Sequence, residues 1–471
     1  MNEENYMNQT TKAQDAAGHN GITEGVIWKQ LLLFFFPILF GTFFQQLYNT
    51  IDAVIVGRFV GKEALAAVGG PTGTLINLLI GFFIGLSSGA TVIISQFYGA
   101  KQEKRVREAV HTAITFSVIT GILFTFIGII GAPFALKAMG TPDDILHYAV
   151  VFMRVYFAGV TANLIYNMGA GILRAIGDSK RPLYFLIASC FTNIILDILF
   201  VVCLHMGVGG AALATVLSQL LSAVLVIRLL VRTRESYRLI PKALKVHPDM
   251  LKRIIRIGFP AGLQSVMYSL SNIIIQSSIN TLGTDTIAAW TAYGKIDSIF
   301  FTIVSAFGIA ITTFVGQNHG AGKKDRIYKG IRVCMTMCIA SSIALSFLFY
   351  TFGNHIFLLF TADPSVISIG TEILRYLAPV YVTYICIEIC SGSLRGTGDC
   401  WIPMLLTCLG VCVLRIVWIW VAVPLHPTIE TVIFSYPMTW VTTSILFIFY
   451  FTFFSRLKWR RLPVLLRRQA P

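Results

Sequence analysis

Two aspartates and an asparagine interrupt long apolar runs of this sequence. Asp52 lies within the apolar run 28–56, and Asn193 and Asp197 lie within the run 182–204. Because Asn193 and Asp197 are four residues apart, they share one face of a helix. A carboxylate in a membrane interior is costly unless it faces a polar cavity, and such residues therefore usually mark a path for ions or protons. The chemistry that these side chains suggest is the binding of a cation or a proton.

Asp52 and Asp197 would share one pocket if the helices that carry them pack together. Two neighbouring carboxylates in a medium of low dielectric constant cannot both stay ionised cheaply, so the pair should take up and release a proton. The same oxygens would also suit Na⁺, a hard cation. The alternative is structural, with Asp52 pinning a helix and Asp197 pairing with a basic residue. We favour the first interpretation, because two acids at membrane depth are costly to keep for packing alone.

The helix that carries Asp52 should also bend. Pro37 precedes Asp52 by fifteen residues, which is about 22 Å along an α-helix. Proline removes one main-chain hydrogen bond and usually kinks the helix. We predict a hinge at Pro37 and therefore a moving part of the protein.

The composition is that of an integral membrane protein. Of the 471 residues, 55% are hydrophobic and 13% are charged, whereas charged residues make up about 25% of soluble domains. Apolar segments long enough to cross a bilayer are expected at twelve places. They lie near 28–56, 64–97, 108–131, 146–171, 182–204, 209–231, 253–281, 286–316, 329–352, 367–393, 402–423 and 431–454.

The distribution of basic residues sets the orientation and argues against nucleic acid as a partner. The formal net charge is +15, but lysine and arginine concentrate in alternate loops and in the two tails. This is the positive-inside pattern of membrane proteins, and it favours a lipid bilayer as the partner. We expect a multi-pass protein of the cell membrane with both termini in the cytoplasm.

The chain repeats itself at an offset of about 221 residues. Gln96-Phe-Tyr-Gly-Ala100 corresponds to Gln317-Asn-His-Gly-Ala321, and Leu173-Arg-Ala-Ile-Gly-Asp178 corresponds to Leu394-Arg-Gly-Thr-Gly-Asp399. Each half has six spans, so both halves should enter the membrane in the same sense. The predicted parts are a disordered cytoplasmic tail 1–26, an amino-terminal lobe 27–231, a cytoplasmic linker 232–250, a carboxy-terminal lobe 251–455 and a basic cytoplasmic tail 456–471.

The order of these motifs resembles the multidrug and toxic compound extrusion (MATE) family over about residues 27–455. The resemblance is carried by the proline and aspartate of the first span and by the duplicated glutamine and arginine motifs. It implies an all-α membrane protein with twelve helices in two pseudo-symmetric six-helix lobes around a central V-shaped cleft. It also implies a secondary antiporter, without a cofactor, that exports amphipathic, often cationic compounds in exchange for H⁺ or Na⁺ by alternating access.

One branch of the family has an acidic site in the amino-terminal lobe, and this sequence matches it. The resemblance implies that Asp52, Asn193, Asp197 and Thr215 bind the proton or Na⁺, with Asn167 as an accompanying polar residue. No metal other than Na⁺ is expected at these residues.

Other branches of the family carry acids on helices seven and ten. Here helix seven has Gln264 and Asn272 but no acid, and helix ten has Glu388, so the resemblance gives weaker support to an ion site in the carboxy-terminal lobe. Gln264, Asp297 and Glu388 are candidates for that lobe's wall of the cleft.

Several residues of the spans suggest packing or pairing roles. The glycines at every fourth residue of 81–89 should allow another helix to approach closely. Gln96 and Gln317 should cap helix ends on the cytoplasmic side and are candidates for an inner gate. Glu388 and Arg415 could pair across the carboxy-terminal lobe.

Other functions agree less well with the sequence. A flippase for a lipid-linked saccharide, from the same superfamily, remains the alternative, and a strongly cationic cleft would favour it. An intramembrane enzyme is disfavoured because no metal or nucleophile motif of a known protease or hydrolase stands in the sequence. No ATP-binding motif is present either, so an ion gradient should supply the energy. We expect amphipathic small molecules and the lipid bilayer as partners, and a monomer.

Overall fold

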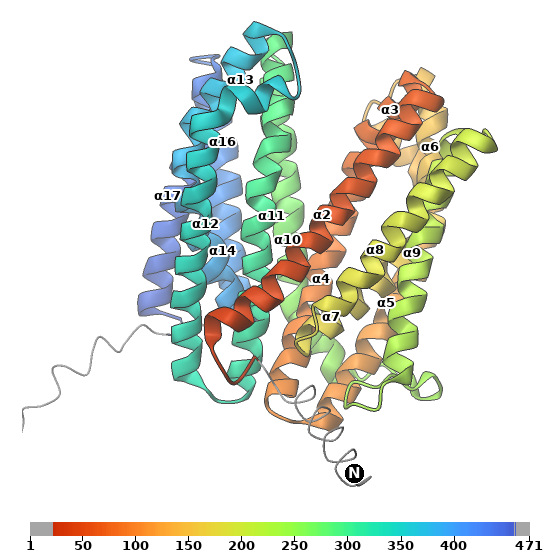
Figure 1. The fold of residues 1–471 in the computed structure, drawn as a ribbon, viewed down its shortest axis with the longest axis vertical. Helices are drawn as coiled ribbons and strands as arrows, with labels where there is room; N and C mark the ends of the chain where they lie inside the picture. The colour runs from red at the N-terminus through yellow and green to blue at the C-terminus, as the bar shows by residue number, and fades with distance from the viewer. Residues whose placement is uncertain (1–21, 456, 458–471) are drawn as a thin grey trace, which may run out of the picture.

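A computed structural model describes residues 22–455 and 457 of the chain (Figure 1). Most of the predicted tails 1–26 and 456–471 therefore lies outside the described residues. All regular elements in the described part are helices, which confirms the predicted fold class. Ten helices are long and apolar enough to cross a membrane, and an eleventh is added if one pair of helices bent by 50° is counted as a single span.

The first half of the chain forms the helices of the amino-terminal lobe. Their bounds are α2 (Ile27–Phe59), α3 (Lys62–Ala67), η1 (Val68–Thr72), α4 (Gly73–Gly99), α5 (Glu103–Ala138), the bent pair α6 (Asp143–Ala158) and α7 (Val160–Ala175), α8 (Lys180–Asp197), η2 (Ile198–Cys203) and α9 (Gly207–Arg232).

The second half repeats this order in the carboxy-terminal lobe. A short turn η3 (Pro241–Ala243) precedes α10 (Pro248–Ile279), α11 (Thr284–Gly320), α12 (Lys324–Leu358), α13 (Pro364–Leu377), η4 (Ala378–Val380), α14 (Tyr381–Gly396), α15 (Trp401–Thr407), η5 (Cys408–Val413), α16 (Leu414–Ala422) and α17 (Ile429–Phe453).

The predicted seventh span corresponds to α10, which is a helix but does not pass the hydropathy test for a span. Its apolar part contains Gln264, Asn272 and Gln276, which lower its mean hydropathy. It packs along α4 of the other lobe. In Figure 1 the two lobes lie close together at the end that holds the α4–α5 and α11–α12 connections and diverge toward α3 and α13.

Helix α2 belongs to both lobes. Its first half is buried in the hydrophobic core of the carboxy-terminal lobe, where the ring of Phe35 stacks on that of Phe307 with the centroids 4.1 Å apart. Its second half packs against α8, and Gly41 faces Leu186 there. Pro37 lies between these two contact regions, inside a continuous helix. A bend at Pro37 would therefore change the orientation of the two lobes relative to each other.

The seam between α4 and α10 is lined by small residues on both helices. A β-carbon at Gly85 would overlap the main chain of Gly262, and one at Gly89 would overlap the main chain near Gly258. This is the close helix approach that the glycine repeat of 81–89 predicts. The two lobes therefore meet through main-chain contact along this seam.

Two glutamines tie the lobes together at their converging ends. The Gln96 amide on α4 donates to the main-chain oxygen of Gly396, 2.9 Å away, and the Gln317 amide on α11 donates to that of Ala175 at 2.7 Å. Each bond joins the glutamine motif of one lobe to the arginine motif of the other. The two bonds are related by the sequence repeat, and we call them the glutamine pair. These glutamines thus bridge the lobes, where the sequence suggested helix caps.

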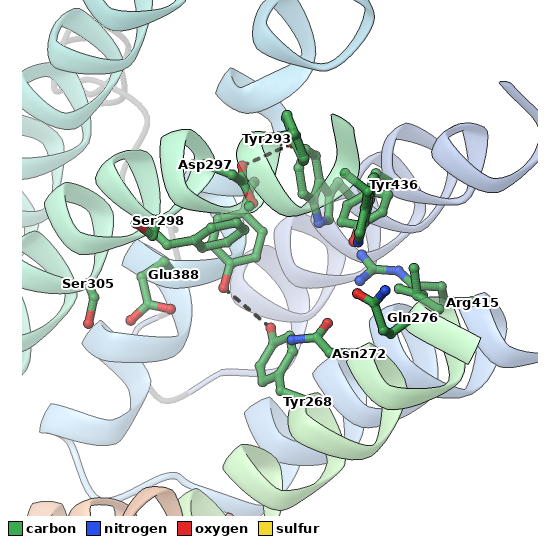
Figure 2. Close-up of a pocket in the computed structure, with 16 residues that line it drawn as sticks. Tyr268, Asn272, Gln276, Tyr293, Asp297, Ser298, Ser305, Glu388, Arg415 and Tyr436 are labelled. Carbon is green, nitrogen blue, oxygen red and sulfur yellow. Dashed lines mark hydrogen bonds between the residues drawn. The ribbon is translucent and has the colours of Figure 1, made fainter. Parts of the chain in front are cut away.

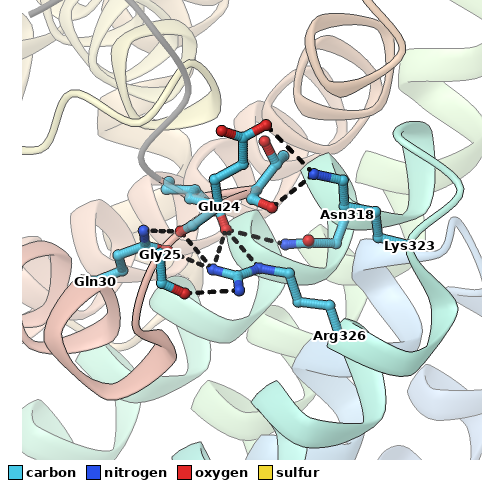
Figure 3. Close-up of polar contacts among 8 residues, drawn as sticks. Glu24, Gly25, Gln30, Asn318, Lys323 and Arg326 are labelled. Carbon is cyan, nitrogen blue, oxygen red and sulfur yellow. Dashed lines mark hydrogen bonds and ion pairs between the residues drawn. The ribbon is translucent and has the colours of Figure 1, made fainter. Parts of the chain in front are cut away.

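The segment before α2 is fixed to the carboxy-terminal lobe. The Arg326 guanidinium donates to the main-chain oxygens of Ile22, Glu24 and Gly25 and to the side chain of Gln30 (Figure 3). Since this segment leads directly into α2, Arg326 fixes the end of α2 that is buried in the carboxy-terminal lobe.

Candidate functional site

Three helices bring the predicted acidic residues of the amino-terminal lobe together. Helix α2 packs on α8, and α8 packs on α9. Asp197 is fully buried, and Asn193 and Asp52 are also buried. Asp52 lies close enough to Asp197 for the two charges to interact. Asp197 is the last residue of α8 before the wider turn η2, a distortion that is frequent at functional sites.

This acidic cluster has unused hydrogen-bonding capacity. Oδ1 of Asp52, both side-chain polar atoms of Asn193 and both carboxylate oxygens of Asp197 have no hydrogen-bond partner among the described residues. Buried polar groups are nearly always paired, because leaving them unpaired costs free energy. In the described part of the chain, no group of three or more His, Cys, Asp or Glu residues could hold a metal. The two acids and the amide instead suit a proton or a small hard cation.

Three further polar residues surround this cluster, and the sequence analysis missed them. Gln219 on α9 and Tyr156 on α6 have buried side-chain oxygens without a partner among the described residues. Tyr48 lies near enough to Asp52 to interact with its charge. Tyr48 stands four residues before Asp52, and Gln219 four residues after Thr215. That spacing on one helix face is the signal that could have found Tyr48 and Gln219.

The other two predicted residues make contacts of their own. The Thr215 hydroxyl is buried and donates to the main-chain oxygen of Ala211 on the same helix, at 3.1 Å. The Asn167 amide donates to both the main-chain and side-chain oxygens of Asn163, each at 2.9 Å. No hydrogen bond within residues 22–455 joins Thr215 or Asn167 to the two acids. Their part in the ion site stays a prediction.

The carboxy-terminal lobe contains an open cavity of about 550 Å³ (Figure 2). Asp297 and Glu388, two of the predicted cleft residues, line it, whereas Gln264 is buried on α10 outside its lining. Asp297 accepts hydrogen bonds from the hydroxyls of Tyr293 at 3.0 Å and Tyr381 at 2.7 Å. The cavity is thus a polar chamber with a carboxylate held by two phenols.

The suggested pairing of Glu388 with Arg415 is wrong. Glu388 pairs with Arg395, two helical turns farther along α14, with 3.2 Å between nitrogen and oxygen. The Arg415 guanidinium lies over the ring of Tyr436, 4.1 Å from its centroid, and donates to the Thr439 hydroxyl at 3.3 Å. Glu388 finds its partner on its own helix face, which the sequence analysis did not consider.

Comparison with known proteins gives matches over nearly the whole chain. Residues 37–199 and 260–421 match the MatE family model, one stretch in each lobe. The probable multidrug resistance protein YoeA of Bacillus subtilis is 30% identical over 79% of this chain and 82% of its own length. The probable multidrug resistance protein NorM of Thermotoga maritima is 24% identical over 83% and 84%.

Solved structures of the same architecture also match. A multidrug resistance MATE family transporter of the MOP superfamily, in an outward-facing conformation, has a TM-score of 0.85 at 22% identity over 91% of this chain and 96% of its own. A MOP superfamily transporter from Pyrococcus furiosus has a TM-score of 0.84 at 23% identity over the same shares. These likenesses show a shared fold.

Proposed function

Because this chain belongs to the MATE family of membrane transporters, we propose that it is a secondary active multidrug efflux antiporter. It exports amphipathic, often cationic compounds in exchange for H⁺ or Na⁺. The observation that carries the proposal is the buried pair Asp52 and Asp197, in which Oδ1 of Asp52 and both carboxylate oxygens of Asp197 lack partners among the described residues. A cation or proton entering from outside would occupy these oxygens, and its arrival would lower the lobe's affinity for cationic cargo.

The arrangement of the lobes supports alternating access. The lobes are joined by the glutamine pair at one end and diverge at the other (Figure 1). The joined end carries the basic connections 101–107 and 323–332, so we place it in the cytoplasm by the positive-inside pattern. Both termini would then be cytoplasmic, and the described conformation is closed toward the cell interior.

Helix α2 is the element best placed to connect ion binding with movement. Asp52 lies in the half that packs in the amino-terminal lobe, and Phe35 lies in the half that packs in the other lobe. Pro37 lies at the boundary between these halves. Loading of the acidic cluster would therefore bias the bend at Pro37 and with it the position of one lobe against the other. The protein would work as a monomer in the cell membrane.

Dye transport in everted membrane vesicles tests this function and identifies the ion. Vesicles that contain the protein should accumulate the ethyl ester of rhodamine B, a permanent cation, when a proton or a Na⁺ gradient is imposed. Matched vesicles without the protein are the control. Repeating the assay with and without Na⁺ at fixed pH separates the two ions. Accumulation that responds to neither gradient would contradict antiport.

A further inference from the structure

A second cavity of the carboxy-terminal lobe lies between α12 and α13, near the diverging ends of the lobes (Figure 1). Its volume is about 530 Å³, which is within the usual range for small-molecule sites, about 300–1,000 Å³. It shares no lining residue with the cavity that holds Asp297 and Glu388. We call it the α12–α13 cavity, and neither the acidic cluster nor the proposed transport step uses it.

Two opposite charges in the α12–α13 cavity are available to a ligand. Glu372 and Arg375 line it from α13, and both residues are exposed. They are three residues apart, a spacing at which oppositely charged side chains often pair on a helix. Within residues 22–455, however, neither side chain takes part in an ion pair or a hydrogen bond. The cavity therefore presents one free carboxylate and one free guanidinium side by side.

A buried hydroxyl in the same wall also lacks a partner. Thr371 is 4% exposed, and its Oγ1 has no hydrogen-bond partner among the described residues. Its methyl group lies 3.6 Å from the position that a β-carbon at Gly353 would take, so the close approach of α12 and α13 buries it. Buried hydroxyls are nearly always paired. An oxygen of a ligand in the cavity would supply the missing partner.

The cavity lies at the level of lipid headgroups. Helix α12 is about 50 Å long and therefore exceeds the hydrocarbon core of a bilayer by about 10 Å at each end. Tyr350 lies eight residues before the end of α12, which is about 12 Å. Tyr350 and Tyr376 line the cavity and are exposed, and tyrosines concentrate at membrane–water interfaces. The basic connection 323–332 is at the other end of α12, so the positive-inside pattern assigns the cavity to the outer leaflet.

An apolar stripe leads from the cavity toward the middle of the membrane. Ile343 and Phe347 precede Tyr350 at intervals of four and three residues, so all three share one face of α12. The side chains of Ile343 and Phe347 are well exposed, and on a membrane helix such side chains contact acyl chains. A polar cavity next to an exposed apolar stripe fits an amphipathic ligand with a charged headgroup and an acyl chain.

We propose that the α12–α13 cavity binds phosphatidylethanolamine of the outer leaflet. Arg375 binds the phosphate, Glu372 accepts hydrogen bonds from the primary ammonium group, and the acyl chains lie along the apolar stripe. The Thr371 hydroxyl donates to a headgroup oxygen. A carboxylate favours a primary ammonium over a trimethylated one, because only the former donates charge-assisted hydrogen bonds. The lipid is a resident of this site and not the cargo, so the assignment goes beyond the proposed efflux function.

A series of methylated lipids tests the assignment on the wild-type protein. Native mass spectrometry of the purified full chain in detergent, stripped of lipid, counts the phospholipid molecules that remain bound. Phosphatidylethanolamine should bind about tenfold more tightly than phosphatidylcholine with the same acyl chains, because charge-assisted hydrogen bonds are lost in the choline lipid. The N,N-dimethyl lipid keeps one N–H donor and should have an intermediate affinity. Equal affinities for the three lipids would overturn the assignment.

Substitutions in the cavity locate the bound lipid. Glu372→Gln should abolish the preference for the ethanolamine lipid and change the affinity for the choline lipid by less than about twofold. Arg375→Gln should weaken the binding of both lipids about tenfold, because both carry the phosphate. The control Glu430→Gln changes an exposed acid of the same lobe that does not line the cavity, and it should change neither affinity. A preference that survives Glu372→Gln would overturn the assignment.

The soluble headgroup distinguishes a lipid from a free zwitterion. O-phosphoethanolamine carries the same phosphate and ammonium groups without the acyl chains, so at equal concentration it should leave the lipid bound. Displacement of the lipid by this compound would assign the cavity to a soluble ligand and overturn the assignment to a membrane lipid. The measurement involves no transport, so its result is independent of the efflux function.

Discussion

The glutamine pair should set how tightly the lobes close at their converging ends. Gln317 is 1% exposed, and its bond to Ala175 is buried. Replacing it by alanine leaves a buried carbonyl unpaired, at a cost of about 2 kcal/mol. Gln96 is only half-buried, so Gln96→Ala should cost about 1 kcal/mol. The population of the closed state relative to the open state should then fall about 30-fold for Gln317→Ala and about fivefold for Gln96→Ala. It should fall about 150-fold in the double variant if the two effects add.

Spin-label distances across the converging ends measure this shift. Labels at Lys104 and Lys324, both exposed and in different lobes, can be placed in a chain whose exposed Cys203 is replaced by serine. The single and double glutamine variants should shift the distance distribution toward longer distances, in the order of the calculated costs.

The matched control is Gln102→Ala, which removes an exposed glutamine from the adjoining connection and should leave the distances unchanged. Wild-type distances in the double variant would refute the idea that these two bonds hold the lobes together.

Two other contacts give predictions about stability and order. Gly85→Ala should lower the thermal denaturation temperature in detergent, because the added methyl group overlaps the main chain of Gly262 and overpacking costs about 1–3 kcal/mol. The control Gly131→Ala, whose methyl group meets no atom within 4 Å, should leave that temperature unchanged. Equal effects of the two substitutions would argue against the tight seam. Arg326→Gln should speed hydrogen exchange in the segment before α2, because it removes the guanidinium donors to three carbonyls. The control Arg332→Gln, which changes an exposed arginine, should leave the exchange rate unchanged. Unchanged exchange in Arg326→Gln would exclude Arg326 as the anchor.

Hydropathy and repeats predicted most of the fold. The apolar segments became helices because a bilayer leaves main-chain groups no other partners, and the duplicated motifs located the two lobes. The pattern could not show that α2 and α10 each pack against the opposite lobe. That arrangement depends on which small residues of two helices contact each other, such as Gly85 and Gly262. The spacing of glycines in one helix does not identify the residues of the other helix that pack against them.

The structure brings some of the predicted site residues together. Spacing and membrane depth located Asp52, Asn193 and Asp197, which the structure brings to one buried region. The partners of Glu388 and Arg415 could not be inferred, because each had several candidates within reach on neighbouring helices. An unpaired buried base is visible only after every acid near it has been assigned a partner.

Gradient-driven dye accumulation by acid variants tests the central claim most directly. The measurement compares everted vesicles that contain equal amounts of wild-type protein, Asp52→Asn, Asp197→Asn or the control Asp143→Asn, which changes an exposed acid at the start of α6. We predict that Asp52→Asn and Asp197→Asn each abolish most of the accumulation that the ion gradient drives, while the control keeps it. Full accumulation in both variants would contradict a coupling role for the buried acids.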